Sequence, residues 1–334
     1  MNLLQSIFGV GEARGRYPDS LIDKAIERTV DGTDPRLRLV PGYRRRLREP
    51  IIRAIDHVVA LVDGMVDPVP ADKGHYAVEP RLGALFDSAP AMLELLARDR
   101  ELTRFLSSRD GLLADRVTCL LLAERTERTV LGMELAGDQV RREVSQAAVS
   151  FAGHRLVEPA ADVAEMSRQL KRRAFDHLLT LALGRIAERR AERSDLKRQR
   201  DLLRRKLADL KHGRWSFDAD GGKPLNPEAL EANLARIGQQ LAALGADQDV
   251  LKTHLGIVAG VLENASRQLW SETVTIDLDA MNIRRDAADP SARSIRLREL
   301  HNVLGRRMSM LPLAIVPGDL PPREDLLTAT RRYF

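Results

Sequence analysis

The chain has 334 residues, of which 44% are hydrophobic, 30% charged and 4% aromatic, and its formal net charge is +5. This length and apolar content are enough for a buried core, so they exclude a largely disordered chain. The single cysteine, Cys119, excludes an intramolecular disulfide and a zinc site built from several cysteines. Many charged residues combined with few aromatic residues indicate a large share of exposed helix.

The first ten residues place four large apolar side chains at helical spacing: Leu3, Leu4, Ile7 and Phe8. So short a segment, with no basic residue, is a helix docked on its own domain or a weak membrane anchor, and docking is the favoured interpretation. No segment has the roughly 18 consecutive apolar residues of a membrane span, and no secretory signal is recognisable. We therefore expect a cytoplasmic protein, with peripheral attachment to a membrane as the alternative.

Residues 1–110 have the 3.6-residue apolar period of helices and are predicted to form a small helical module. The second of its helices is expected to begin near Pro50, because proline suits the first turn of a helix. Residues 65–80 are rich in proline and are predicted to be a connection. The predicted helices cover residues 18–32, 50–64 and about 90–106.

After Gly111 the apolar period changes to two, which predicts β-strands. Val149 and Phe151 lead toward Gly153 and His154, where a tight turn is predicted. The predicted strands are marked by Val117–Glu124, by Leu131, Met133 and Leu135, by Val274, Ile276 and Leu278, by Ile295 and Leu297, and by Leu311, Leu313 and Ile315.

The predicted fold is α+β: an N-terminal helical module and an antiparallel β domain, with a long antiparallel coiled-coil hairpin inserted between its strands. The predicted domains are the helical module (1–110), a discontinuous β domain (111–160 plus 271–318), the hairpin arm (161–270) and a C-terminal tail (319–334).

The second half of the arm carries the strongest periodic pattern in the chain. Its apolar residues repeat at alternating spacings of four and three from Leu230 to Leu269, with one polar interruption at Gln248. Such heptads form the seam of a coiled coil and need a partner stripe. The preceding helix, predicted from about residue 162 to residue 211, offers that stripe, weakly between Arg189 and Ser194.

The basic excess of the chain lies on this preceding helix. Residues 161–214 contain 16 cationic and 8 acidic residues, a net charge of +8. On a helical wheel the cations of its distal part fall within an arc of about 80° and form a stripe roughly 33 Å long. Its members are Arg189, Arg193, Lys197, Arg200, Arg204 and Lys211.

The stripe has a functional and a structural interpretation. It attracts an anionic partner, or it is a solvated face whose arginine stems cover the apolar seam. At the predicted tip of the arm, residues 213–226 hold Trp215 and Phe217. These two aromatic side chains either contact a partner or cap the hairpin.

Signatures of catalysis are not recognisable in the sequence. It has no phosphate-binding loop, no nucleophile elbow and no metal-binding cluster of histidine or cysteine. Cys119 is predicted to be a buried structural cysteine. The adjacent pairs Asp56-His57 and Asp176-His177 lie on predicted helices, where neighbours point about 100° apart. We predict no cofactor, no metal and no catalytic residue, and we expect a protein that is not an enzyme.

The predicted function is that of a non-catalytic adaptor or scaffold whose arm presents the basic stripe to a macromolecular partner. A protein is the expected partner, and self-association into a homo-oligomer is one form of it. The alternative is a binder of nucleic acid or of an anionic membrane through the same stripe. A weaker alternative is an enzyme whose site is assembled from residues far apart in the sequence.

Overall fold

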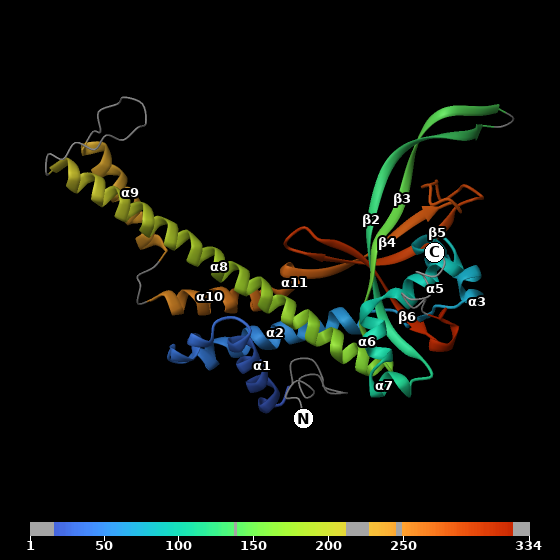
Figure 1. Cartoon of the computed structure of the whole chain (residues 1–334), viewed down its shortest axis with the longest axis horizontal. Helices are drawn as coiled ribbons and strands as arrows, with labels where there is room; N and C mark the ends of the chain where they lie inside the picture. Colours follow the sequence, from blue (N-terminus) through green and yellow to red (C-terminus); the bar gives the residue numbers. More distant parts are fainter. Residues whose placement is uncertain (1–16, 137–138, 212–226, 245–248, 323–334) are drawn as a thin grey trace, which may run out of the picture. The chain divides into compact units, whose positions relative to one another are not determined.

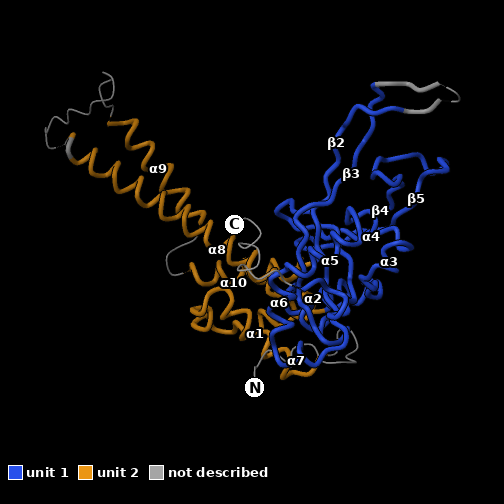
Figure 2. The backbone as a smooth tube through the Cα atoms, turned by 45° about the vertical axis from the view of Figure 1, so that its right-hand side comes forward, with its two compact units in different colours: residues 1–12, 56–174, 266–334 blue, residues 13–55, 175–265 orange. Residues whose placement is uncertain are grey.

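The computed structural model describes residues 17–136, 139–211, 227–244 and 249–322 (Figure 1). By backbone contacts the chain divides into two compact units, coloured separately in Figure 2. Unit 1 comprises residues 1–12, 56–174 and 266–334, and unit 2 comprises residues 13–55 and 175–265. The N-terminal segment, the arm tip with Trp215 and Phe217, and most of the C-terminal tail lie outside the described residues.

The fold is α+β, as predicted, with N-terminal helices and an antiparallel sheet. The helices are α1 (Asp19–Asp31), η2 (Pro35–Leu39), α2 (Tyr43–Asp63), α3 (Lys73–Val78), α4 (Pro80–Leu85), α5 (Ala89–Arg98), α6 (Arg100–Leu106), α7 (Arg109–Leu112), α8 (Val163–Lys211), α9 (Pro227–Ala243), α10 (Val250–Glu263), α11 (Ala265–Gln268) and η4 (Pro317–Asp319). The strands are β1 (Val69–Pro70), β2 (Val117–Ala136), β3 (Gln139–Ala160), β4 (Leu269–Leu278), β5 (Arg293–Asn302) and β6 (Arg307–Ile315).

The sheet belongs to unit 1. Five antiparallel strands follow the order β3-β2-β6-β5-β4, and the short β1 pairs in parallel with β6. The alternation predicted for β4 is confirmed, because Ile276 and Leu278 are buried whereas Thr273 and Thr275 are exposed. β6 is central, and its residues from Met308 to Ile315 are all buried.

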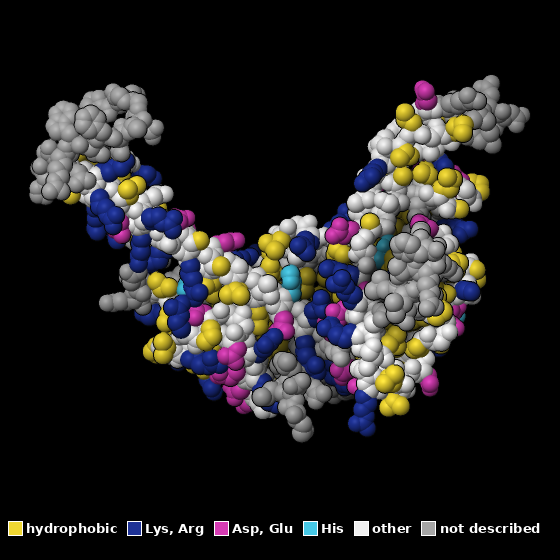
Figure 3. Space-filling view, in the orientation of Figure 1, with side chains coloured by type: hydrophobic (Ala, Val, Ile, Leu, Met, Phe, Trp, Pro, Cys, Tyr) yellow, Lys and Arg dark blue, Asp and Glu magenta, His cyan; other side chains and the backbone are white. Residues whose placement is uncertain are grey.

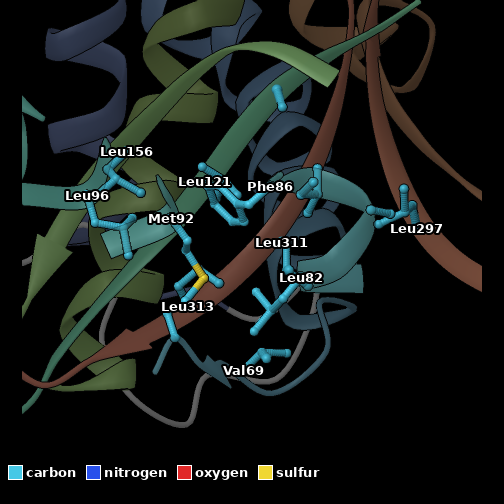
Figure 4. Packing of buried hydrophobic residues seen from close by; sticks show 14 of the residues in the cluster. Val69, Leu82, Phe86, Met92, Leu96, Leu121, Leu156, Leu297, Leu311 and Leu313 are labelled. Carbon is cyan, nitrogen blue, oxygen red and sulfur yellow. The ribbon is translucent and has the colours of Figure 1, made fainter. Parts of the chain in front are cut away.

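Two apolar layers cover the faces of the sheet. On one face the core extends from α4, α5 and α6 to β2, β5 and β6, and Figure 4 shows Phe86, Met92 and Leu96 packed against the strands. On the other face Val62 of α2 and Met166 and Leu170 of α8 pack against β2 and β6. These layers bury the alternating apolar residues predicted for β4, β5 and β6, namely Ile276, Leu278, Ile295, Leu297, Leu311, Leu313 and Ile315, whereas Leu131 and Met133 of β2 are exposed.

The predicted turn at Gly153-His154 is wrong, because β3 continues through both residues. The pairs Leu122–Arg155 and Glu124–Ala152 enclose one residue of β2 but two of β3, which is a β-bulge. Gly153 has a φ of +63° at the bulge, a conformation that glycine adopts without steric cost. His154 Nε2 lies 2.7 Å from the carbonyl oxygen of Leu85, so the bulged segment contacts the end of α4.

Three predictions for the N-terminal helices also differ from the structure. α2 begins at Tyr43, and Pro50 lies inside it, because the preceding Arg, Leu and Glu residues favour helix. The helix predicted for residues 90–106 is divided at Asp99, whose carboxylate accepts hydrogen bonds from the amides of Glu101 and Leu102. The connection at residues 65–80 contains β1 and α3.

The prediction of a coiled-coil hairpin inserted between strands of the sheet is wrong. The second half of the arm is not one helix: α9 ends at Ala243 and α10 begins at Val250, and the long α8 packs with both of them. Gly245 and Asp247, between the two helices, both have low helix propensity. β3 and β4, which precede and follow these helices in the chain, are the two ends of the sheet order.

Within unit 2 the predicted apolar seam is buried. Phe175, Leu179, Ala182 and Ile186 of α8 are buried, and so are the heptad residues Leu230, Ile237, Leu255, Val258 and Leu262 of α9 and α10. Figures 1 and 2 both show α9 lying along the distal part of α8. The heptad pattern therefore identified which faces of these helices are buried, although it did not predict where the helix is interrupted.

Candidate functional site

The candidate site is the distal part of α8, where the predicted basic stripe lies. Residues 189–206 contain nine cationic and three acidic side chains. Their helical spacing follows from the sequence, because the strong helix formers Arg, Lys, Leu and Glu fill most of this segment. Figure 3 shows lysine and arginine side chains gathered along this part of the helix. The surface is therefore strongly cationic.

The members of the stripe differ in exposure. Arg189 and Arg204 are exposed, whereas Arg193, Lys197 and Arg200 are half-buried against neighbouring side chains. Lys211 is the last residue of α8, and its side chain lies outside the described part of the structure. The five stripe residues whose side chains are described therefore all lie on one helix, α8.

Two stripe residues have ion pairs on their own helix. Arg189 Nη1 lies 3.2 Å from Glu192 Oε2, and Arg200 Nη2 lies 3.2 Å from Asp201 Oδ1. Exposed pairs of this kind stabilise a protein by only about 0–1 kcal/mol, because solvent screens both charges. An external anion can therefore replace these acidic partners at little cost in stability.

At the base of the stripe, a carboxylate that the sequence analysis did not single out collects three basic side chains. Asp34 is only 4% exposed. Its carboxylate accepts two hydrogen bonds of 3.0 Å from Arg36, and Arg190 Nη2 donates to Oδ2 at 2.5 Å. His254 Nδ1, in α10, lies 3.0 Å from the same Oδ2. We call these four residues the Asp34 network.

The Asp34 network explains why the apolar seam of α8 is weak near Arg189. At this level α8 is joined to η2 and α10 by Arg190 and Asp34 instead of by apolar side chains. Sequence spacing could not reveal the contact, because Asp34 is 156 residues from Arg190 and 220 residues from His254. The one local signal is Asp34 before Pro35, a pattern typical of a helix N-terminus.

Two pKa values in the network are lowered. Burial alone would raise the pKa of Asp34, but hydrogen bonds from Arg36 and His254 and the charge of Arg190 hold it well below its ordinary range. For His254, burial lowers the pKa by more than the hydrogen bond with Asp34 raises it, and the charges of Arg190 and Arg36 also act to lower it. At neutral pH we expect an ionised Asp34 that accepts a hydrogen bond from neutral His254.

This arrangement predicts that unit 2 loses stability as the pH falls below about 6.5, the ordinary pKa of histidine. The unfolded chain then binds a proton that folded His254, with its lower pKa, does not bind, so stability decreases from the unfolded pKa down to the folded one. The contribution of Asp34 is complete at neutral pH and is lost only in more acidic solution, as the pH falls through its lowered folded pKa. The measurement is the urea unfolding midpoint, by circular dichroism, between pH 7.5 and pH 5.

Two variants test whether His254 causes this pH dependence of stability. His254→Gln should flatten the pH dependence, whereas His75→Gln, which alters a half-exposed histidine paired with Asp72, should retain it. Equal slopes in the two variants would show that His254 does not cause the effect.

The space beside the network is small. Arg189, Arg190 and Arg193 line a cavity of about 30 Å³ together with Leu244, Val250, Thr253 and His254. A cavity of this size holds one or two water molecules. Asp34 and His254, beside this cavity, form a polar connection that joins η2 to α8 and α10.

Other side chains that could take part in catalysis are buried or are bonded to neighbouring residues. Cys119 is buried, as predicted, and burial raises the pKa of its thiol, which keeps the thiol protonated. Asp176 pairs with Arg28 at 2.8 Å, and His57 Nε2 lies 2.7 Å from the carbonyl oxygen of Leu269. Among the described residues, no group of three or more His, Cys, Asp or Glu side chains could hold a metal ion.

No helix within the described ranges is both long enough and apolar enough to cross a membrane. The chain matches no family model, no curated protein and no solved structure.

Proposed function

We propose that the protein is a non-catalytic adaptor that uses the basic stripe of α8 to bind an acidic surface of a protein partner. The observation that carries this proposal is the excess of nine cations over three acidic residues between residues 189 and 206, on a helix whose cations are exposed or half-buried. A single-sign field of this kind accelerates encounter with an oppositely charged surface and selects its orientation.

The chemistry around the stripe favours a protein over a nucleic acid. Leu202, on the same stretch of α8, is 54% exposed. Protein interfaces combine apolar and arginine contacts in this way. The stretch contains no aromatic side chain on which a base could stack. Nucleic acid and an anionic membrane are therefore the outcomes against which the proposal is tested.

Reversing three charges of the stripe should abolish partner binding. Arg189→Glu, Arg200→Glu and Arg204→Glu change the local charge by six units, and we expect at least a tenfold loss of affinity for the partner. The full chain, immobilised, is exposed to a nuclease-treated, detergent-solubilised lysate of its native cells. Proteins bound by the wild type but not by the variant are identified, and their affinity is measured at increasing salt.

The matched control carries the same change of net charge on unit 1, as Arg98→Glu, Arg104→Glu and Arg293→Glu. The first two side chains are 80% and 74% exposed, with acidic neighbours on their own helices. This control should keep the partner. Identical capture by both variants contradicts the proposal, as does wild-type binding that is restricted to duplex DNA, RNA or anionic vesicles.

A further inference from the structure

A cleft in unit 1 opens where two neighbouring strands separate. β5 pairs with β6 from Arg298–Met310 to His301–Arg307 and no further. Beyond Met310, β6 pairs with β1 instead, at Val69–Leu313 and Pro70–Ala314. β5 meanwhile stays paired with β4 as far as Arg293. In Figure 4, Leu297 and Leu311 lie on strands that have moved apart.

The cleft has a volume of about 310 Å³, within the range of sites for small organic molecules. Its lining comes from five places in the chain: residues 64–66 after α2, residues 79–81 at the start of α4, Thr273 of β4, residues 294–298 of β5 and residues 310–312 of β6. Because β4 occupies one edge of β5 and β6 has diverged from the other, every second residue between 294 and 297 directs its backbone amide and carbonyl groups toward the open edge.

Three arginines line the cleft, and only one of them is neutralised. Arg81 forms two hydrogen bonds with Glu79, at 2.7 and 2.8 Å, so this pair carries no net charge. The side chain of Arg296 is exposed and has no hydrogen bond or ion pair within the described residues. Arg298 donates from Nε to Ser271 Oγ at 2.9 Å and from Nη1 to the carbonyl oxygen of Gly64, which are neutral partners.

The cleft therefore has two uncompensated positive charges, one on a fixed side chain and one on a free side chain. Arg298 is held in place by its two hydrogen bonds, whereas Arg296, two residues earlier on the same face of β5, can close onto a ligand. The hydroxyls of Thr273 and Ser294 are exposed beside them and add neutral donors. Paired guanidinium groups and hydroxyls match the oxygens of a doubly charged oxyanion.

The rest of the lining is apolar. Met65, Val66, Met310, Leu311 and Pro312 contribute to it. A bare inorganic ion would leave this surface wet, whereas the organic part of a larger anion would cover it. The geometry points to a binding site for a small organic phosphate, with its phosphate between Arg296 and Arg298 and its organic group against Met310 and Leu311. This site lies in a different unit from the stripe and is independent of the adaptor proposal.

The test uses three probes with the full chain: phenyl phosphate, inorganic phosphate and phenol. Phenyl phosphate should bind at least tenfold more tightly than either of the others, because only it offers both the charge and the apolar group. Arg296→Gln should weaken phenyl phosphate binding about tenfold, since one charge-assisted contact is lost. Binding is measured by isothermal titration calorimetry at fixed ionic strength.

The matched control is Arg293→Gln, which removes an exposed arginine of the same strand that does not line the cleft. Its affinity for phenyl phosphate should stay within twofold of the wild type. The inference is overturned if phenyl phosphate does not bind, if phenol binds as tightly, or if the two variants weaken binding equally.

Discussion

Replacing Asp34 by alanine should destabilise unit 2 by about 2–4 kcal/mol. The carboxylate is 4% exposed and is the common acceptor for Arg36, Arg190 and His254. Its loss leaves buried His254 without an acceptor and brings two guanidinium groups close together with no anion between them. Both arginine side chains are about half exposed and can turn to solvent, so the cost stays below that of an entirely buried pair.

The effect is best measured locally, because a chain of two units need not unfold in a single step. Hydrogen exchange of the amides in η2 and α10 should accelerate about 30- to 1000-fold, which corresponds to the same free energy. Asp31→Ala is the matched control: Asp31 is 57% exposed and pairs with Arg38 on the surface. It should change exchange by less than about fivefold. Equal effects of the two substitutions would show that the Asp34 network does not hold these helices together.

The Asp34 network also shows the limit of what the sequence could predict. Periodicity reports which face of an element is buried, and it found the buried positions of β4 and the seam of α9 and α10 correctly. It does not report which distant segment covers that face. The same sequence that predicts a cationic stripe cannot predict that Arg190 turns to a carboxylate 156 residues away.

The predicted features that proved wrong share a cause. Gly153 and Pro50 are residues that often begin or end an element, and both were interpreted from this local preference. In the structure Gly153 forms a bulge inside β3, which stays paired with β2 on both sides of it. Pro50 lies within α2, where its neighbours Leu47 and Ile51 are buried in the core. Tertiary packing overrides local preference at such positions. Gly245 shows the opposite error, since the heptads continue across a place where the helices are separate.

The candidate sites were predictable to different degrees. The stripe is a property of one helix, so a helical wheel was sufficient to locate it. The cleft between β5 and β6 depends on β6 exchanging β5 for β1, a change of partner that leaves no periodic signal. A hint was present, since Arg296 and Arg298 alternate with Ile295 and Leu297. The division of the chain into predicted domains, and the contact proposed for the stripe, stay predictions.

Replacing Glu299 by alanine should destabilise the sheet of unit 1 by about 3–5 kcal/mol. Glu299 is fully buried, and it continues the apolar face of β5 formed by Ile295 and Leu297. Arg125 Nε lies 2.7 Å from one of its oxygens and Arg307 Nε lies 2.5 Å from the other. Arg125 is itself only 6% exposed, so removing the carboxylate leaves a buried cation with Glu127 as its remaining acidic partner.

The control for this substitution is Glu272→Ala, since Glu272 is the exposed cross-strand neighbour of Glu299 on β4. Two acidic residues in opposite positions repel each other, so its removal should be neutral or slightly stabilising. Stability is followed by hydrogen exchange of residues 293–302 and 307–315 in urea. If Glu299→Ala and Glu272→Ala have the same effect, the buried carboxylate does not support the sheet.

A double variant separates two contributions to the free energy of unfolding: that of the ion pair itself, and the loss caused by removing only one of its partners. Arg125→Leu combined with Glu299→Met should recover most of the stability that Glu299→Ala loses, because apolar side chains of similar size avoid the desolvation of both charges. Arg307 is 43% exposed and can move its charge into solvent. A double variant as unstable as Glu299→Ala would show instead that the carboxylate is needed for the pairing of β5 with β6, through its contact with Ser309. The β5–β6 pairing ends at the cleft, with the pair Arg298–Met310. If the carboxylate of Glu299 is needed for that pairing, it also helps to hold the adjacent Arg298 in place at the cleft.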